Sequence, residues 1–469
     1  MRSLSRAGLA VALLCALSLP GPAAAQSDGP VYIVQEGDTL IGIALRFGVD
    51  VDDLAAANAL ADPSAIVPGM QLRLPGYEGI GGVLETIPVA AGEDLRSLAL
   101  RFGVEAADLA RLNRLVNPAR LYVGQPLIVP VSEGESGSLQ AELTVGEAQT
   151  GALDVAARAG LNPWHLQEIN GAVGRTWIVP QNGIFLPGGS GATDALPEQI
   201  ASLSLTPERP GQGHTEVVEV ILTEEGQVSG ALGETPLNFV SSAADSLSRI
   251  ALQGIHALAE PGLVDLAFTF TPASGQPFSF VQPIRIEAED YHSEYVTVPA
   301  ETLDPANTVP EDDRIAAVVA PASPLRLWEG PFQFPTDYYE TFPSLFGSRR
   351  NYNNLGWNYY HAGLDLYGNK DTEIHAPAPG VVAFSGLLTV RGNATYIDHG
   401  WGVYTGYLHQ SQLFVQAGDR VETGQLIGMV GNTGRVTGPH LHWEIWVGGV
   451  PVQPLDWTSQ TYPSSESGG

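Results

Sequence analysis

Residues 438–447 read Gly-Pro-His-Leu-His-Trp-Glu-Ile-Trp-Val, a stretch with two histidines separated by one residue. Its second half is rich in aromatic and β-branched residues, which is typical of a strand. Side chains two positions apart on a strand point to the same face, so His440 and His442 should lie side by side. One imidazole can then bind a metal ion while the other stays free beside it.

The region 358–444 holds six of the ten histidines of the chain, together with a candidate carboxylate ligand. His361 and Asp365 flank Gly363, which permits a tight turn that could direct both side chains inward. A catalytic zinc needs three protein ligands and a fourth position open to water. The residues therefore predict a zinc set of two histidines and one carboxylate: His361, Asp365 and one of the pair His440 and His442. The spare imidazole and His409 remain as general base and electrostatic stabiliser.

Four short motifs in this region resemble those of the M23 family of zinc peptidases, the lysostaphin/LytM-type cell-wall endopeptidases. They are His361-x-Gly363-x-Asp365, Tyr407-x-His409, Gly431-Asn-Thr-Gly434 and His440-Leu-His-Trp-Glu444. The resemblance covers residues 325–460 and implies a mainly antiparallel β fold with one catalytic Zn²⁺. It implies that His361, Asp365 and His442 are the zinc ligands and that His409 and His440 are catalytic. Tyr407 occupies the position where the family often places a tyrosine near the reacting carbonyl.

The first 25 residues are typical of a secretory signal peptide. Arg2 and Arg6 precede an apolar run at 9–19 and a small-residue cleavage site at 23–25. The single cysteine, Cys15, lies within this segment, but Leu14 occupies the position where a lipoprotein signal needs a small residue. The sequence therefore predicts export by a signal peptide to the cell wall, the periplasm or the medium, and a mature chain without disulfides.

The chain is strongly acidic, with a formal net charge of −29, which becomes −31 after removal of residues 1–25. Such a charge excludes binding of nucleic acid through bulk electrostatics. No later apolar stretch is long enough to span a membrane. Nothing in the sequence indicates an obligate assembly, so we expect a monomer.

Residues 30–76 and 85–131 form two repeats whose matching residues lie 55 positions apart, as Gly37 and Gly92 do. Each repeat predicts a strand, two helices and a closing strand. This pattern and the text Tyr32-x-Val-x-x-Gly37-Asp-Thr-Leu resemble the LysM module, a binder of N-acetylglucosamine-containing glycans such as those of peptidoglycan. The resemblance implies a glycan-binding groove at the loops that contain Gly37, Asp38, Thr39, Gly69, Gly92 and Gly124. A weaker third copy occupies residues 138–188.

The middle of the chain predicts a β-domain between two linkers. Alternating apolar residues at 264–270 and further strand patterns predict a small β-sandwich over residues 211–300. Residues 189–210 and 301–324 read as linkers, the second also as a strap against its neighbour. Residues 461–469 should form a disordered tail. The chain is thus expected to be multidomain, with α+β LysM modules, a β-sandwich and an antiparallel-β peptidase domain.

Two functional hypotheses follow from this organisation. The first is a secreted zinc endopeptidase that cuts peptide cross-links of peptidoglycan, either D-alanyl links to a diamino acid or a glycine-rich bridge. The second is a catalytically silent or latent M23-fold protein that binds the wall and regulates another hydrolase. The complete set of five histidine and aspartate residues favours the enzyme.

Overall fold

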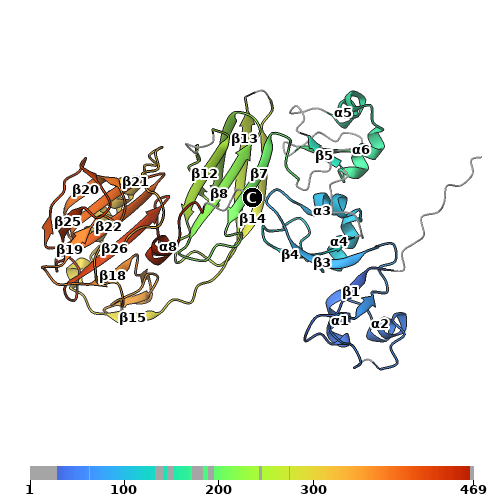
Figure 1. Cartoon of the computed structure of the whole chain (residues 1–469), viewed down its shortest axis with the longest axis horizontal. Coiled ribbons are helices and arrows are strands. Elements are labelled where there is room, and N and C mark those ends of the chain that lie inside the picture. Colours follow the sequence, from blue (N-terminus) through green and yellow to red (C-terminus); the bar gives the residue numbers. More distant parts are fainter. Residues whose placement is uncertain are drawn as a thin grey trace, which may run out of the picture. The chain divides into compact units, whose positions relative to one another are not determined.

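The computed structural model describes most of the chain (Figure 1); the described residues are 29–62, 64–131, 141–144, 151–171, 183–187, 195–241, 246–273 and 275–464. The predicted signal peptide and the last five residues of the predicted tail lie outside them. The described residues form two compact units. One lies within Met1–Glu85 and Pro130–Ser136, and the other within Thr86–Val129 and Gly137–Gly469. None of the described helices is long and apolar enough to cross a membrane.

The first repeat has the predicted order of strand, helix, helix and strand. Its elements are β1 (Val31–Ile33), α1 (Leu40–Phe47), α2 (Val51–Ala57) and β2 (Gln71–Arg73). Helix α1 begins where the Thr39 side chain accepts a hydrogen bond from the Gly42 N–H, and it ends at Gly48 in the left-handed conformation. The buried side chains of Leu40, Phe47 and Leu54 hold the two helices together.

The second and third repeats have the same order of elements, and the helices of both lie in the larger unit. Their elements are β3 (Val83–Pro88), α3 (Leu95–Phe102), α4 (Ala106–Leu112) and β4 (Pro126–Val131), then β5 (Ala141–Thr144), α5 (Ala152–Ala159), α6 (Pro163–Ile169) and β6 (Ile184–Pro187). One asparagine fixes each repeat by bonding the backbone 15 residues later: Asn58 bonds Arg73, Asn113 bonds Ile128 and Asn170 bonds Phe185. The third copy therefore preserves this architectural contact of the other two.

The predicted β-sandwich is present as two four-stranded sheets around a shared core. One sheet contains β7 (Ile200–Thr206), β8 (Thr215–Leu222), β11 (Val240–Ser241) and β12 (Ser248–Gly254). The other contains β9 (Gly226–Leu232), β10 (Thr235–Pro236), β13 (Gly262–Pro272) and β14 (Phe278–Ile286). Strand β7 lies in the stretch that we expected to be a linker. Strand β14 runs through Pro283 without a break, which its position at the sheet edge permits.

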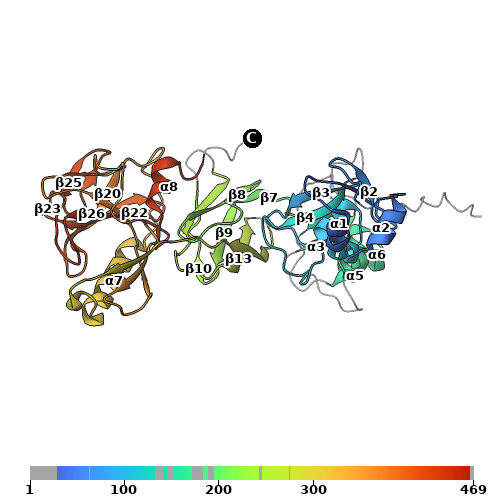
Figure 2. The ribbon, with the colours of Figure 1, turned by 90° about the horizontal axis from the view of Figure 1, so that it is seen from below.

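The second expected linker contains a helix that packs on the C-terminal sheet. After β15 (Ser293–Val296) and a short 3₁₀ turn η1 (Ala300–Thr302), helix α7 (Pro305–Val319) begins at Asp304, whose side chain caps the Ala306 N–H. Helix α7 lies beside the C-terminal domain in Figure 2. Ile315 and Val319 of α7 are fully buried in a cluster with Tyr396 and Leu408 of the sheet. This segment is therefore part of the wall of the C-terminal domain.

The C-terminal domain is built on a seven-stranded antiparallel sheet, as predicted. In spatial order its strands are β18 (Leu364–Tyr367), β26 (His440–Val447), β22 (Val403–Gln410), β21 (Gly392–Gly400), β20 (Gly380–Leu388) and β24 (Arg420–Val421), with β27 (Val450–Val452) paired to β26. The smaller elements are β16 (Arg349–Tyr352), β17 (Tyr359–Tyr360), β19 (Glu373–His375), β23 (Gln412–Leu413), β25 (Leu426–Met429) and α8 (Pro454–Ser459). One face of the large sheet buries the main core, and the opposite face contacts α7 and carries the histidines.

Candidate metal centre

The pairing of β18 with β26 brings a carboxylate and an imidazole together. The antiparallel register sets Asp365 opposite His442 and Tyr367 opposite His440. Leu364 and Leu366, which alternate with Asp365, point into the core on the other face. The hydrophobic pattern of two strands thus fixes the face on which the polar side chains gather.

Three ligand-type atoms meet at this point. The distance from His361 Nε2 to Asp365 Oδ1 is 2.9 Å, from His361 Nε2 to His442 Nδ1 is 2.8 Å, and from His442 Nδ1 to Asp365 Oδ1 is 2.9 Å. All three residues are buried. Gly363 allows this approach for a reason that we did not predict: a Cβ there would lie 2.8 Å from His442 Nε2. Its role is close backbone packing against β26.

The outer partners of the two imidazoles determine their tautomers. His361 Nδ1 lies 2.9 Å from the Leu345 carbonyl oxygen, and His442 Nε2 lies 3.1 Å from the Glu444 carboxylate. Both outer atoms must therefore donate protons, so His361 Nε2 and His442 Nδ1 face Asp365 with free lone pairs. Three lone-pair donors in contact leave no proton to share among them. This donor set fits a divalent metal ion, and histidine and carboxylate ligands suit zinc.

Burial and neighbouring charges shift the pKa values of several groups in the cluster. Burial lowers the pKa of His361 to about 4, so its imidazole is neutral at pH 7. Burial acts to raise the pKa of Asp365, but its position beside His361 and His442 holds that pKa well below its usual range, so the carboxylate is ionised. Burial also opposes ionisation of Glu444, yet the hydrogen bond from His442 and the charge of Arg391 lower its pKa to about 2.

His409 reaches the site because of one backbone angle. Strand alternation would place it on the core face with Tyr407, but His409 has a φ of 64°, in the left-handed region. Its N–H donates to the Arg391 carbonyl at 3.0 Å, and its Nδ1 donates to the Thr433 carbonyl at 2.8 Å. Burial and the neighbouring histidines lower the pKa of His409 well below its usual range. The ring is therefore neutral, with a free lone pair on Nε2.

His440 is the second imidazole beside the cluster. Its Nδ1 lies 2.8 Å from the Gly438 carbonyl oxygen, so Nδ1 donates and the lone pair is on Nε2. That Nε2 lies 3.6 Å from Asp365 Oδ1. The rings of His440 and His409 are 5.2 Å apart between centroids. The imidazoles of His409 and His440 thus stand next to the three converging ligand atoms.

The structure does not bring Tyr407 to this site. The Tyr407 side chain is completely buried on the core face of the sheet, and its hydroxyl is bonded to Thr405 Oγ1 at 2.8 Å. His399, which the sequence leaves without a partner, is also fully buried, between the Pro379 carbonyl and Thr405. His375 stays near the surface and pairs with Glu373.

A cavity of about 190 Å³ opens at His361, His409 and His442. Its wall also includes three arginines and three tyrosines: Arg350, Arg391, Arg435, Tyr352, Tyr359 and Tyr360. No local sequence pattern predicts a role for these residues, because they come from several loops and strands that are brought together only by the fold. Thr308 and Asp312 of α7 complete part of the wall.

The two repeats differ at the loops predicted to bind glycan. In the first repeat, a Cβ added at Gly37 or at Gly69 would meet no described atom within 4 Å. Asp38 accepts hydrogen bonds from Tyr32 and from the Gln35 N–H, and Thr39 caps α1. The loop residues of this repeat therefore also have turn-forming and capping roles.

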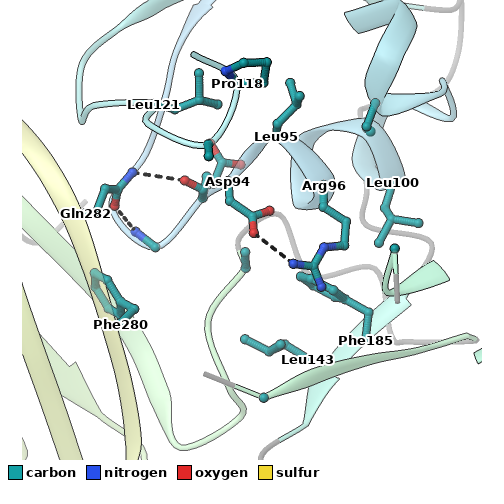
Figure 3. Close-up of a pocket in the computed structure, with 18 of the residues that line it drawn as sticks. Asp94, Leu95, Arg96, Leu100, Pro118, Leu121, Leu143, Phe185, Phe280 and Gln282 are labelled. Carbon is teal, nitrogen blue, oxygen red and sulfur yellow. Dashed lines mark hydrogen bonds and ion pairs between the residues drawn. The ribbon is translucent and has the colours of Figure 1, made fainter. Parts of the chain in front are cut away.

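In the second repeat, the same loops lie against the β-sandwich. The Gly92 N–H donates to Gln282 Oε1 at 2.7 Å, and Gln282 Nε2 donates to the Glu93 carbonyl at 3.0 Å (Figure 3). A Cβ at Gly124 would lie 2.9 Å from the Glu208 side chain. A cavity of about 870 Å³ lies beside this contact, lined in part by Asp94 and Arg96 (Figure 3). The predicted groove of the second repeat is thus in contact with another part of the same unit.

Residues 359–454 match the model of Peptidase family M23, and residues 32–75 and 88–130 match the LysM domain model. The chain is 41% identical over 127 residues to the DD-carboxypeptidase/endopeptidase Mpg of Neisseria meningitidis, covering 27% of the chain and 29% of Mpg. It is 42% identical over 111 residues to the peptidoglycan DD-endopeptidase ShyC of Vibrio cholerae, covering 24% of the chain and 26% of ShyC.

Among solved structures, the antimicrobial peptidase lysostaphin from Staphylococcus simulans aligns with a TM-score of 0.21 and 30% identity, covering 23% of the chain and 48% of lysostaphin. The chain thus spans less than a third of the length of the two curated relatives. The chain carries an M23 peptidase domain preceded by two LysM domains.

Proposed function

We propose that the protein is a zinc-dependent endopeptidase that hydrolyses peptide cross-links of peptidoglycan. One observation carries the proposal: the buried lone pairs of His361 Nε2, Asp365 Oδ1 and His442 Nδ1 converge within hydrogen-bond distance of one another. The names of the relatives support the substrate, because Mpg is named a DD-carboxypeptidase/endopeptidase and ShyC a peptidoglycan DD-endopeptidase.

The three converging residues would hold the metal. Zinc bound there would supply a Lewis acid for the scissile carbonyl and an activated water. Asp365 would add a negative charge to the ligand set, and Glu444 would hold His442 in the tautomer that ligation needs.

The two neighbouring imidazoles would transfer protons. His409 is neutral with its Nε2 lone pair free, so it can accept a proton from the attacking water. His440 has the same arrangement through Gly438 and can stabilise the developing charge or return a proton to the leaving amine. Tyr407 is left out of this set because its hydroxyl lies on the other face of the sheet.

The LysM domains would hold the enzyme on the glycan strands. We assign this role to the first LysM domain, because the corresponding loops of the second contact the β-sandwich at Gln282. A wall hydrolase acts outside the cytoplasm, which agrees with residues 1–25 serving as a signal peptide.

The test is incubation of the mature protein with purified sacculi, with and without a zinc chelator, followed by mass spectrometry of the released fragments. The proposal predicts cross-link-derived peptides with new free amines from the zinc-loaded protein. His440→Ala should abolish their release. His375→Ala should not, because His375 is paired with Glu373 near the surface. A wild-type protein that binds sacculi and zinc but releases nothing would favour the regulatory alternative.

A further inference from the structure

Three arginines line the cavity at the metal centre of a chain that has 22 basic and 51 acidic residues: Arg350, Arg391 and Arg435. Cations gathered at a catalytic cavity either balance protein carboxylates or bind an anionic group of the ligand. The partners of each guanidinium distinguish these two roles.

Arg350 is balanced by protein carboxylates. Its Nε lies 3.3 Å from Glu294 Oε2, and one terminal nitrogen lies 3.5 Å from Asp365 Oδ2. Only 15% of its side chain is exposed. Arg350 therefore serves to fix Asp365 and the β15 segment.

Arg391 is balanced in the same way by α7. Its guanidinium lies 3.1 Å from Glu311 and 2.9 Å from Asp312. Its backbone N–H also donates to Glu311 at 2.9 Å. With two carboxylates beside it, Arg391 has little positive charge to offer a ligand.

Arg435 differs from both, because no carboxylate of the described residues lies within ion-pair distance of it. One terminal nitrogen donates to the Thr302 carbonyl at 3.1 Å, and the guanidinium carbon lies 4.8 Å from the centre of the Tyr352 ring. A carbonyl and an aromatic face orient a guanidinium without cancelling its charge. Most of its five N–H donors are left for another partner.

The loop that carries Arg435 is fixed next to the catalytic imidazole. The Arg435 N–H donates to the Val390 carbonyl at 2.7 Å, and two residues earlier the Thr433 carbonyl accepts the hydrogen bond from His409 Nδ1. A group bound by Arg435 would therefore lie in the same cavity as the reacting bond.

We propose that Arg435 binds a carboxylate of the substrate peptide beside the scissile bond. This inference rests on the proposed function and narrows its substrate. A guanidinium matches a carboxylate with two parallel hydrogen bonds. Of the two kinds of cross-link, a glycine-rich bridge has no carboxylate at that position. A D-alanyl link to a diamino acid has such a carboxylate when the diamino acid keeps a free carboxyl group next to the amine that forms the link.

The test compares two synthetic cross-linked peptides that differ only at this carboxyl, which is free in one and a carboxamide in the other. The wild type should cleave the free acid with a kcat/KM roughly 10- to 100-fold higher, the range of one hydrogen-bonded charge pair. Arg435→Gln should lose this preference, so that its kcat/KM for the acid and for the carboxamide become equal. Arg435→Lys should retain part of it. Arg420→Gln, an exposed arginine on β24, is the matched control and should behave as wild type.

A third peptide, amidated only at its C-terminus, shows which carboxylate is bound. If this amidation lowers kcat/KM and amidation of the carboxyl beside the linked amine does not, the assignment to the carboxyl beside the linked amine is overturned. An equal loss of rate on the acid and the carboxamide in Arg435→Gln would also overturn the proposal, because it would indicate a structural role. Cleavage of neither peptide by the wild type would refute the proposed function instead. In that case, the affinities of the same two peptides, measured by calorimetry, test the role of Arg435. Tighter binding of the acid that is lost in Arg435→Gln supports the proposal, and equal affinities of the wild type for the two peptides overturn it.

Discussion

Replacing Glu311 with alanine should loosen α7 and slow catalysis, although Glu311 lies outside the segment 359–454 that matches the peptidase family. The Glu311 carboxylate is buried and accepts three hydrogen bonds: from the Val390 N–H at 2.8 Å, from the Arg391 N–H at 2.9 Å and from the Arg391 guanidinium at 3.1 Å. The Arg391 carbonyl in turn accepts the His409 N–H at 3.0 Å. Glu311 therefore supports the left-handed conformation of His409 through a single intermediate residue.

The expected loss follows from the groups left without a partner. Alanine removes the acceptor of two enclosed backbone N–H groups, each of which costs about 1 to 3 kcal/mol when unpaired. The variant should thus lose about 2 to 6 kcal/mol of local stability around α7 and the Val390–Arg391 turn. A displaced His409 should lower kcat/KM by roughly 10- to 100-fold, since small errors in the position of a catalytic group are costly.

Hydrogen exchange of α7 and of residues 387–393 measures the first effect, and turnover of cross-linked peptide measures the second. Asp313→Ala is the control, because Asp313 is exposed on the same helix, and it should change stability by no more than about 0.5 kcal/mol. If Glu311→Ala exchanges and turns over like Asp313→Ala, the reasoning is refuted.

Three further predictions concern other parts of the chain. Glu444→Gln should weaken zinc binding by roughly 10- to 100-fold, because an amide is a poorer acceptor for His442 Nε2–H. Competition with a chromophoric chelator measures the zinc affinity, and an unchanged affinity would contradict the proposed role of Glu444. Both carboxylate oxygens of buried Glu216 lack a hydrogen-bond partner, and burial raises its pKa well above the usual value. The folded state then keeps a proton that the unfolded state releases, so wild-type stability should fall as pH rises above about 4.3, while Glu216→Gln should lack this component. If the melting temperatures of the wild type and of Glu216→Gln change in parallel with pH, Glu216 does not contribute to the pH dependence of stability. The chain should bind one N-acetylglucosamine oligomer in a calorimetric titration, and two equivalent sites would show that the second LysM domain is open.

The amino-acid sequence by itself indicated LysM domains followed by an M23 domain, and it narrowed the candidate metal ligands to His361, Asp365 and one of the pair His440 and His442. The repeat spacing and one asparagine per repeat specify the strand–helix–helix–strand modules, because these contacts are local. The alternation in 440–447 determined that His440 and His442 share a face. It could not decide between them, since both positions are equivalent along the strand.

Only the tertiary structure decided which imidazole joins His361 and Asp365, because the register of β18 against β26 sets Asp365 opposite His442. It also placed His409 in the site and Tyr407 outside it, since one left-handed φ at residue 409 breaks the alternation of β22. That angle is held by hydrogen bonds to Arg391 and Thr433, which are distant in sequence. The physical reason is general: periodicity fixes the face of a side chain, but pairing between distant segments fixes which side chains meet.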